Sequence, residues 1–308
     1  MYRYSFAFIL GPRFPHGSIP VFHLKLLIKN IIPFEVRRKV KSNKRRLINN
    51  IIKKNNSKTS LLDVRKLLKY DFDISKGDNI IVASSFGNLN AEYTPKELIS
   101  LLQDIVSKEG NIVMPFYPPG NSYEWAKSGK IFDMKMTPSS MGILTQTFSE
   151  MPDVLKSKHP TKAVVVWGNN AEEIVKGHEY STTPFYWDSP YGWFIKNSSK
   201  SLGLGLKNIP IFHSIEDIIL EKVSLYKKDK VNLKLKDYNA EIFEYPVLIH
   251  DPRKIGKLVD AGDYVRNLNA TTYRRKEFGY SFCYIIDNQE LFDICKNEFN
   301  SGNLRDNK

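Results

Sequence analysis

Two residues of the chain have side chains suited to proton transfer, and each stands in a distinctive segment. His159 is followed by Pro160 at the entrance to the apolar segment 163–168. An imidazole has a neutral form near pH 7, so His159 is a candidate general base. Glu216 stands in the first turn of a predicted helix, where the helix dipole also favours a carboxylate. Because the two residues are far apart in the chain, the sequence alone does not bring them together.

Further motifs surround these two residues in a definite order. The chain carries an Asp, a Thr-Pro-x-x-Met-Gly segment, a Ser-x-His-Pro segment, a Gly-Leu-Gly segment and a His-x-x-Glu segment. The pieces are Asp133, Thr137–Gly142, Ser157–Pro160, Thr183–Phe185, Ser189–Tyr191, Gly203–Gly205 and His213–Glu216. Together with the apolar segments 80–85 and 111–115, they resemble the aminoglycoside 3-N-acetyltransferase family over roughly residues 60–300. No single piece is specific alone, but their order and spacing together are.

The resemblance implies an acetyl-CoA-dependent N-acetyltransferase that acts on an amino sugar. The acceptor ammonium must lose a proton before it attacks a thioester, and the resemblance gives that base role to His159, with Glu216 orienting its ring. Contact with the acceptor is expected from Asp188, Tyr191 and His213. Asp188 before Ser-Pro is also typical of a turn, and His213 of a helix entry. Contact with coenzyme A is expected from Ser84, Ser85 and Phe86, although serines after a strand are also common turn residues.

Several residues differ from the family pattern. Ala83 replaces a histidine before the paired serines, Ser140 replaces an arginine before Met-Gly, and 90–92 replaces a paired-glycine turn. Around the His-Pro segment, Lys156 stands in place of arginine and Ala163 in place of serine. These changes weaken the expected binding of coenzyme A more than the assignment of the base.

Apolar segments of strand length alternate with capped helical segments after residue 60. The pattern predicts strands at 80–83, 111–114, 163–167 and 201–206, and helices that begin at Ser60 or Asp63, Thr94, Thr137, Ala171, Ser214 and Gln289. Such alternation is typical of a layered α/β/α domain around a central mixed sheet that is covered on both faces. Segments 231–235 and 241–248 predict antiparallel additions toward the C-terminus. The chain is therefore expected to divide into a basic N-terminal arm, 1–60, and a catalytic domain, 61–308.

The net charge of +13 lies entirely in the N-terminal arm. Residues 1–60 hold fourteen Lys and Arg against one acid, whereas the other 248 residues hold 32 basic and 32 acidic residues. Prolines keep the arm's apolar runs short of the ~18 residues of a membrane span, and no signal-peptide cleavage site follows them. The basic clusters of 37–54 favour either contact with anionic lipid at the inner membrane face or a solvated lead-in to the body. Nucleic acid is a weaker candidate partner because no recognition module accompanies the cluster.

Other kinds of chemistry have less support in the sequence. Cys283 and Cys295 provide neither a disulfide framework nor the spacing of metal ligands, which favours a reducing cytoplasm. We expect no metal, because the six histidines form no His-x-x-x-His pair and transfer from a thioester does not require one. The nearest approach to a hydrolase nucleophile motif, 279–283, lacks the final glycine.

The sequence is consistent with three functions. A nucleotide- or lipid-linked amino sugar of surface polysaccharide biosynthesis suits a basic protein, because a polycationic aminoglycoside would be repelled. Aminoglycoside 3-N-acetylation, which confers antibiotic resistance, is the second function. The third is a catalytically degenerate adaptor that binds membranes or polyanions. The oligomeric state is also open, with a homodimer as one expectation.

Overall fold

The structure is a computed structural model that describes residues 57–219, 226–227, 229–251, 265 and 271–301. The chain divides into two compact units, Met1–Lys54 and Asn55–Lys308, and every described residue lies in the second unit. The predicted basic arm, 1–60, therefore lies outside the described residues except for its last four. Those four residues are joined to the body, since the backbone N–H of Thr59 donates to the carbonyl of Asn90 at 3.0 Å. No described helix is long and apolar enough to cross a membrane.

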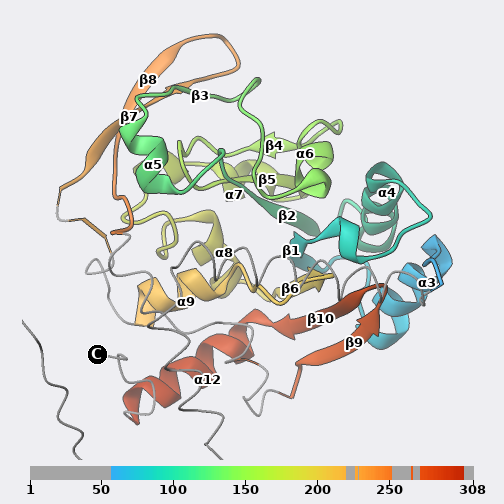
Figure 1. Cartoon of the computed structure of the whole chain (residues 1–308). Helices are drawn as coiled ribbons and strands as arrows, with labels where there is room; N and C mark the ends of the chain where they lie inside the picture. Colours follow the sequence, from blue (N-terminus) through green and yellow to red (C-terminus); the bar gives the residue numbers. More distant parts are fainter. Residues whose placement is uncertain (1–56, 220–225, 228, 252–264, 266–270, 302–308) are drawn as a thin grey trace, which may run out of the picture. The chain divides into compact units, whose positions relative to one another are not determined.

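Seven strands of the described residues form one mixed sheet, in the order β4-β5-β2-β1-β6-β10-β9 (Figure 1). The central strands β2, β1 and β6 are parallel to one another, while β5 and β10 flank them in antiparallel pairs. The bounds are β1 Asn79–Ser84, β2 Asn111–Phe116, β4 Leu155–Lys156, β5 Ala163–Gly168, β6 Lys200–Leu204, β9 Arg274–Phe278 and β10 Ser281–Asp287. The prediction of a central mixed sheet is confirmed.

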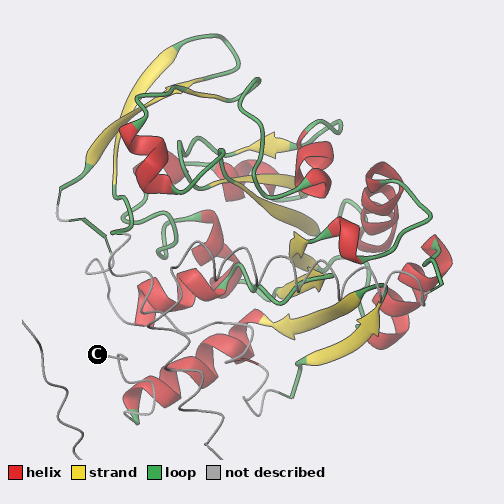
Figure 2. Ribbon diagram, viewed as in Figure 1, coloured by secondary structure: helices red, strands yellow, loops and turns green. Residues whose placement is uncertain are grey.

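Helices cover both faces of this sheet (Figure 2). One face is covered by α3 (Leu61–Lys66), α4 (Pro95–Val106) and α6 (Ile143–Ser149), and the other by α7 (Ala171–Val175), α8 (Pro190–Lys196), α9 (Phe212–Ile219) and α12 (Asn288–Asn300). Alternate residues of each strand feed the two hydrophobic cores. Ile80 and Val82 of β1 pack in the first core, and Ile81 packs in the second. A strand buried on both faces reads as a continuous apolar run, which is the pattern of segments 80–83 and 163–167.

A second sheet of the described residues has three strands in the order β3-β7-β8. Strands β7 (Val231–Lys236) and β8 (Ile242–Val247) form an antiparallel pair, and β3 (Phe132–Asp133) lies parallel to β7. Figure 2 shows this sheet at the upper left, apart from the main sheet. The predicted antiparallel additions are confirmed, and β9 and β10 add a further antiparallel pair at the edge of the main sheet.

Two predicted helix starts have different outcomes. Thr94 caps α4 as predicted, because its side chain accepts from the backbone of Glu97 while Glu97 bonds back to the Thr94 N–H. The start predicted at Thr137 is wrong, since α6 begins at Ile143. Thr137 instead closes a turn, in which its hydroxyl accepts from the N–H of Asp133 at 2.9 Å. The described residues also form α5 (Ser122–Lys127) and the short helical turns Leu67–Asp71, Phe86–Asn88 and His178–Tyr180.

Candidate active site

The predicted site residues lie in segments that adjoin one end of the strands of the main sheet. Strands β1, β2 and β6 are parallel, and their carboxyl ends are Ser84, Phe116 and Leu204. Strand β5 runs in the opposite direction, so its first residue, Ala163, pairs with Phe116 at the same edge. The segment 157–162 thus enters the sheet beside the carboxyl ends of the parallel strands. Open α/β sheets bind their ligands at the carboxyl ends of their parallel strands.

His159 lies in this segment with only 2% of its surface exposed. Its Nδ1 accepts hydrogen bonds from the backbone N–H groups of Lys162, at 3.0 Å, and Thr161, at 3.3 Å. In a neutral ring with Nδ1 as acceptor, Nε2 carries the proton. Burial, with help from the positive potential of His178 and Lys162, holds the pKa of His159 well below its usual value. His159 is therefore a neutral imidazole, and its Nδ1 lone pair accepts hydrogen bonds from the backbone N–H groups of Thr161 and Lys162.

His178 is a second buried histidine, and it is not among the site residues predicted from the sequence. Its ring centroid lies 4.7 Å from that of His159. The Ser157 hydroxyl accepts from the N–H of Val164 at 2.9 Å and donates to Nδ1 of His178 at 2.8 Å, while Nε2 of His178 donates to the carbonyl of Pro184 at 3.1 Å. Burial lowers the pKa of His178 to about 4. Both ring nitrogens are thus engaged by protein groups, and no motif around His178 indicated this.

Glu216 pairs with His213 and forms no hydrogen bond with His159 among the described residues. The Oε2 atom of Glu216 lies 3.3 Å from Nδ1 of His213. Residues three apart on a helix share one face, so the His-x-x-Glu spacing on α9 places the two side chains together locally. The His213 side chain is 49% exposed and that of Glu216 is 10% exposed. In the neutral form of the ring, with Nδ1–H directed at the carboxylate, Nε2 of His213 carries the lone pair.

Aromatic rings connect the histidines. Phe185 lies 5.2 Å from His213 and 5.8 Å from His250, measured between ring centroids. Tyr226 stacks on His250 at 4.3 Å. The four histidines that follow the arm therefore form two groups, although they are separated by up to 91 positions in the chain. His159 contacts His178, whereas His213 and His250 both contact Phe185. His250 is kept neutral, because burial and the nearby charge of Lys162 hold its pKa well below the usual value.

Tyr117 and Lys162 line the same region, with Tyr191 behind them. The hydroxyls of Tyr117 and Tyr191 are 2.8 Å apart, and the ring of Tyr191 meets Phe185 edge-on at 4.9 Å. Tyr191 is completely buried, so it supports Tyr117 and Phe185 from inside the core. The ammonium of Lys162 lies 4.0 Å from the ring centroid of Tyr117, and burial lowers its pKa to about 8.

Asp188 and Asp217 have different environments. The exposed Asp188 carboxylate accepts from the N–H and the hydroxyl of Thr182, both at 2.9 Å, and so closes the loop before α8. The buried Asp217 carboxylate accepts from Thr183 at 2.5 Å and from Tyr226. Burial raises the pKa of Asp217 to about 6. Asp188 thus has the turn role that the sequence left open, while its predicted contact with the acceptor stays a prediction.

The residues predicted to bind coenzyme A follow β1. The Ser84 hydroxyl is shielded from solvent and has no hydrogen-bond partner among the described residues. The N–H of Ser85 donates to the carbonyl of Leu204 at 2.8 Å, and Phe86 packs edge-on against Tyr93 at 6.0 Å. Gly142, at φ +98°, passes close to the Ser84 carbonyl. Contact of these three residues with coenzyme A stays a prediction.

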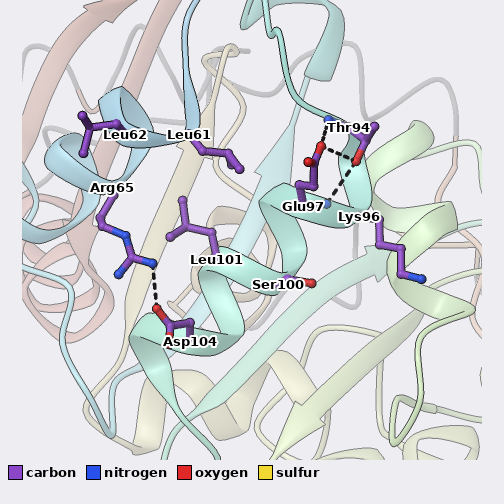
Figure 3. Close-up of a pocket in the computed structure, with 9 residues that line it drawn as sticks. All are labelled: Leu61, Leu62, Arg65, Thr94, Lys96, Glu97, Ser100, Leu101 and Asp104. Carbon is purple, nitrogen blue, oxygen red and sulfur yellow. Dashed lines mark hydrogen bonds and ion pairs between the residues drawn. The ribbon is translucent and has the colours of Figure 1, made fainter.

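A surface groove of about 710 Å³ lies elsewhere, between α3 and α4 (Figure 3). Its wall includes Arg65 and Asp104, which form an ion pair at 2.8 Å. The close-up shows the capping bonds of Thr94 and Glu97 at its rim. None of the histidines lines this groove, and two of its charged side chains, Arg65 and Asp104, are paired with each other. The groove therefore contains none of the residues that the sequence predicts for the site.

Comparison with known proteins identifies relatives of the chain. The protein YokD of Bacillus subtilis (strain 168), described as an SPbeta prophage-derived aminoglycoside N(3')-acetyltransferase-like protein, is 28% identical over 123 residues. That alignment covers 34% of this chain and 45% of YokD, so it spans less than half of the relative.

Solved structures share the fold over most of the chain. The apoenzyme of aminoglycoside acetyltransferase AAC(3)-IVa is 19% identical with a TM-score of 0.62, over 81% of this chain and 92% of that one. AAC-IIIb with CoASH is 17% identical with a TM-score of 0.65, over 80% and 98%. AAC-VIa with sisomicin is 17% identical with a TM-score of 0.64, over 80% and 99%. The model of the family described as Aminoglycoside 3-N-acetyltransferase matches residues 81–300, most of the chain. The chain belongs to the aminoglycoside 3-N-acetyltransferase family.

Proposed function

We propose that the protein transfers an acetyl group from acetyl-CoA to the amine of an amino sugar. Family membership supports the reaction class. The observation that carries the proposal is the His213–Glu216 pair, in which a half-exposed imidazole lies within hydrogen-bond distance of a carboxylate. The unsatisfied Ser84 hydroxyl at the same edge of the sheet supports binding of the donor.

In this proposal His213 is the general base and Glu216 its orienting carboxylate. Nε2 of His213 accepts the proton that the acceptor ammonium loses, and Glu216 stabilises the imidazolium that forms. Acetyl-CoA supplies the thioester carbonyl. As the new C–N bond forms and the C–S bond breaks, the nitrogen gives up a second proton. One of the two protons goes to the departing thiolate through His213 and the other is released to solvent, so an ammonium and a thioester yield an amide, a thiol and one proton.

The same hydrogen bonds leave His159 and His178 less suited to the base role. A base needs a free lone pair that faces the acceptor, whereas Nδ1 of His159 is held by two backbone N–H groups. Both nitrogens of His178 are bonded inside the protein. These two neutral rings form a polar wall that adds no charge beside the acceptor. His159, the base expected from the sequence, remains the alternative that mutagenesis tests.

The relatives and the charge distribution favour different amino sugars. The names of the relatives support an aminoglycoside as acceptor, which is the second of the three functions left open by the sequence. The nucleotide- or lipid-linked amino sugar is supported by the arm's positive charge and by the absence of a net negative charge in the body. Both acceptors present a sugar amine to one base, so the reaction is common to them.

Thiol release tests the reaction. Purified protein is incubated with acetyl-CoA and each of a panel of amines that includes sisomicin, glucosamine and UDP-linked amino sugars. We expect coenzyme A release that depends on the amine and disappears in Glu216→Gln and His213→Ala. Calorimetry with coenzyme A is run in parallel. Binding of neither donor nor amine would instead favour the degenerate adaptor.

The basic arm suggests a location for the enzyme. We propose that residues 1–56 hold the protein on anionic membranes, because each lysine or arginine near such a surface contributes about 1 kcal/mol. Full-length protein should co-sediment with phosphatidylserine vesicles at low salt and dissociate at high salt. Protein that lacks residues 1–56 should not co-sediment but should keep its thiol-release activity. Equal sedimentation of both forms, or loss of activity on truncation, contradicts this role.

A further inference from the structure

His250 is a partly buried histidine whose ring nitrogens have no hydrogen-bond partner among the residues that the structure describes. The two fully buried histidines differ in this respect. Nδ1 of His159 accepts from two backbone N–H groups, and both nitrogens of His178 are bonded inside the protein. Burial is the main cause that holds the pKa of His250 well below its usual value. A neutral imidazole of this kind has one lone pair and one N–H to offer to a ligand.

Stacking fixes the ring of His250. The ring of Tyr226 lies 4.3 Å away at an interplanar angle of 22°, and that of Phe185 lies 5.8 Å away at 18°. Phe185 is completely buried, so it supports His250 from inside the core. The backbones of Tyr226 and His250 also pair in an antiparallel bridge, beside which the N–H of Lys227 donates to the carbonyl of Ile249 at 2.9 Å. Side-chain and backbone contacts together limit the positions open to the imidazole.

The same contacts lead to the helix that carries the proposed base. The hydroxyl of Tyr226 donates to the carboxylate of Asp217, which is buried on α9. His213 stands four residues before Asp217, so the two lie on one face of α9. The ring centroids of His213 and His250 are 6.4 Å apart, with an interplanar angle of 48°. One helix thus helps to position both imidazoles.

The pair of imidazoles suits a reaction that removes two protons from one nitrogen. The His213 side chain is 49% exposed and His250 is partly exposed, so both rings reach the surface. An amine nitrogen at about 2.9 Å from one nitrogen of each ring can bridge rings at this separation. Conversion of an ammonium into an amide removes two protons, whereas a single imidazole takes only one at a time. A second neutral imidazole beside the first supplies the missing acceptor.

We propose that His250 is a second catalytic base, which accepts a hydrogen bond from the acceptor amine beside His213 and takes its second proton. This role rests on the proposed acetyl transfer. His213 takes the first proton, and the free amine then bonds to the thioester carbonyl carbon, which leaves the nitrogen with a positive charge. His250 takes a proton from that nitrogen as the C–S bond breaks and His213 gives its proton to the thiolate sulfur. The proton on His250 then passes to water, so the products are an amide, a thiol and one released proton.

Electrostatics determines the order of these transfers. Positive charge on His213 is among the causes that lower the pKa of His250, and the charge of Lys162 acts in the same direction. Two neighbouring imidazolium ions are therefore unfavourable, because like charges repel at short distance. His250 accordingly gains its proton as His213 loses its own. The same repulsion from Lys162 favours release of the proton from His250 to water, which returns both rings to the neutral form.

Two substitutions of His250 distinguish hydrogen bonding from proton transfer. His250→Gln keeps an acceptor oxygen but cannot take a proton near pH 7, whereas His250→Phe keeps a ring that can stack on Tyr226 but has no nitrogen. The control is His16→Phe, which makes the same exchange within residues 1–56. Thiol release gives kcat and KM, and calorimetry gives the Kd of sisomicin, glucosamine, UDP-glucosamine and coenzyme A, all with full-length protein. Circular dichroism shows whether each variant folds.

We expect His250→Gln to lower kcat at least about tenfold, with the Kd of the amine within about threefold of wild type. His250→Phe should lower kcat at least as much and also weaken amine binding at least about threefold, because one hydrogen bond is lost. His16→Phe should leave all of these values unchanged. Coenzyme A affinity should be the same in every variant, because His250 faces the acceptor.

The results distinguish this role from the reaction on which it rests. A wild-type kcat in His250→Gln, with coenzyme A release by wild type, overturns the second base and leaves the proposed reaction standing. A kcat lowered only in His250→Phe also overturns it, since His250 would then supply a hydrogen bond and no proton transfer. Absence of coenzyme A release by wild type with all three amines overturns the proposed reaction and the second base together. If His250→Phe does not fold, His250→Gln alone decides.

Discussion

At the scale of single residues, the hydrogen bonds of each imidazole decide what it can do. Of the four histidines, His159 and His178 are buried and His250 is partly buried, and all three have lowered pKa values. Only in His213 is a half-exposed ring combined with a carboxylate that determines which nitrogen carries the proton, as far as the described residues show. The hydrogen bonds made by the two ring nitrogens of a histidine are therefore a better guide to a general base than its place in an expected motif.

Substitution of the two candidate bases should separate them. We expect His213→Ala to lower kcat by about 10²–10⁴-fold, because no side chain is then positioned to take the proton from the ammonium of the amino sugar. His159→Asn is the matched variant, since its amide oxygen can replace Nδ1 as acceptor for the N–H groups of Thr161 and Lys162. The kcat of His159→Asn should stay within about tenfold of that of wild type. Thiol-release kinetics with intact far-UV spectra give the answer, and the reverse pattern would move the base to His159.

At the scale of elements, local patterns worked where a helix or strand depends on its own residues. The cap of α4 and the apolar strands were predictable from short segments. The Thr137 start failed because a Thr-Pro pair also suits a turn, and the Asp133 carboxylate accepts from the N–H groups of Lys135 and Met136 to stabilise that turn. Such competition between capping and turn formation cannot be decided from the pair alone.

Close packing of β6 against β10 explains a glycine in the family-like Gly-Leu-Gly segment. A Cβ on Gly203 would lie 1.8 Å from the Tyr284 ring, so Gly203→Ala forces the ring or the strand to move. We expect a loss of about 1–3 kcal/mol in the free energy of unfolding, measured by urea denaturation. Gly87→Ala is the control, because a Cβ there meets nothing within 4 Å. A loss of similar size in both variants would show that the contact with Tyr284 is not the cause.

At the scale of the whole molecule, buried titratable groups link stability to pH. His178, with a pKa of about 4 in the folded state, binds fewer protons there than in the unfolded chain between about pH 6.5 and 4. Its contribution to stability is therefore lost as the pH falls through that range, up to about 3 kcal/mol. Asp217, with a pKa of about 6, acts in the opposite direction, because the folded state holds its proton between about pH 4 and 6.

The opposing effects predict the behaviour of one variant. Asp217→Asn removes the group that offsets the histidines, so its stability should fall more steeply than that of wild type between pH 6.5 and 4. At pH 8 it should be at least as stable as wild type, because no charged carboxylate is then buried. Urea denaturation at several pH values measures both effects. Parallel stability curves for the two proteins would mean that Asp217 does not titrate in this range.

The sequence by itself determined the family, the α/β/α class and most of the buried strands, because ordered motifs and apolar runs are properties of contiguous residues. It also brought His213 and Glu216 within one helical turn, although the expected partner of Glu216 was His159. Only the tertiary structure decided that His178 contacts His159, that His250 contacts Phe185, and that the Tyr191 hydroxyl bonds that of Tyr117. These features depend on which strand ends share an edge of the sheet, and such long-range pairing leaves no local trace in the chain.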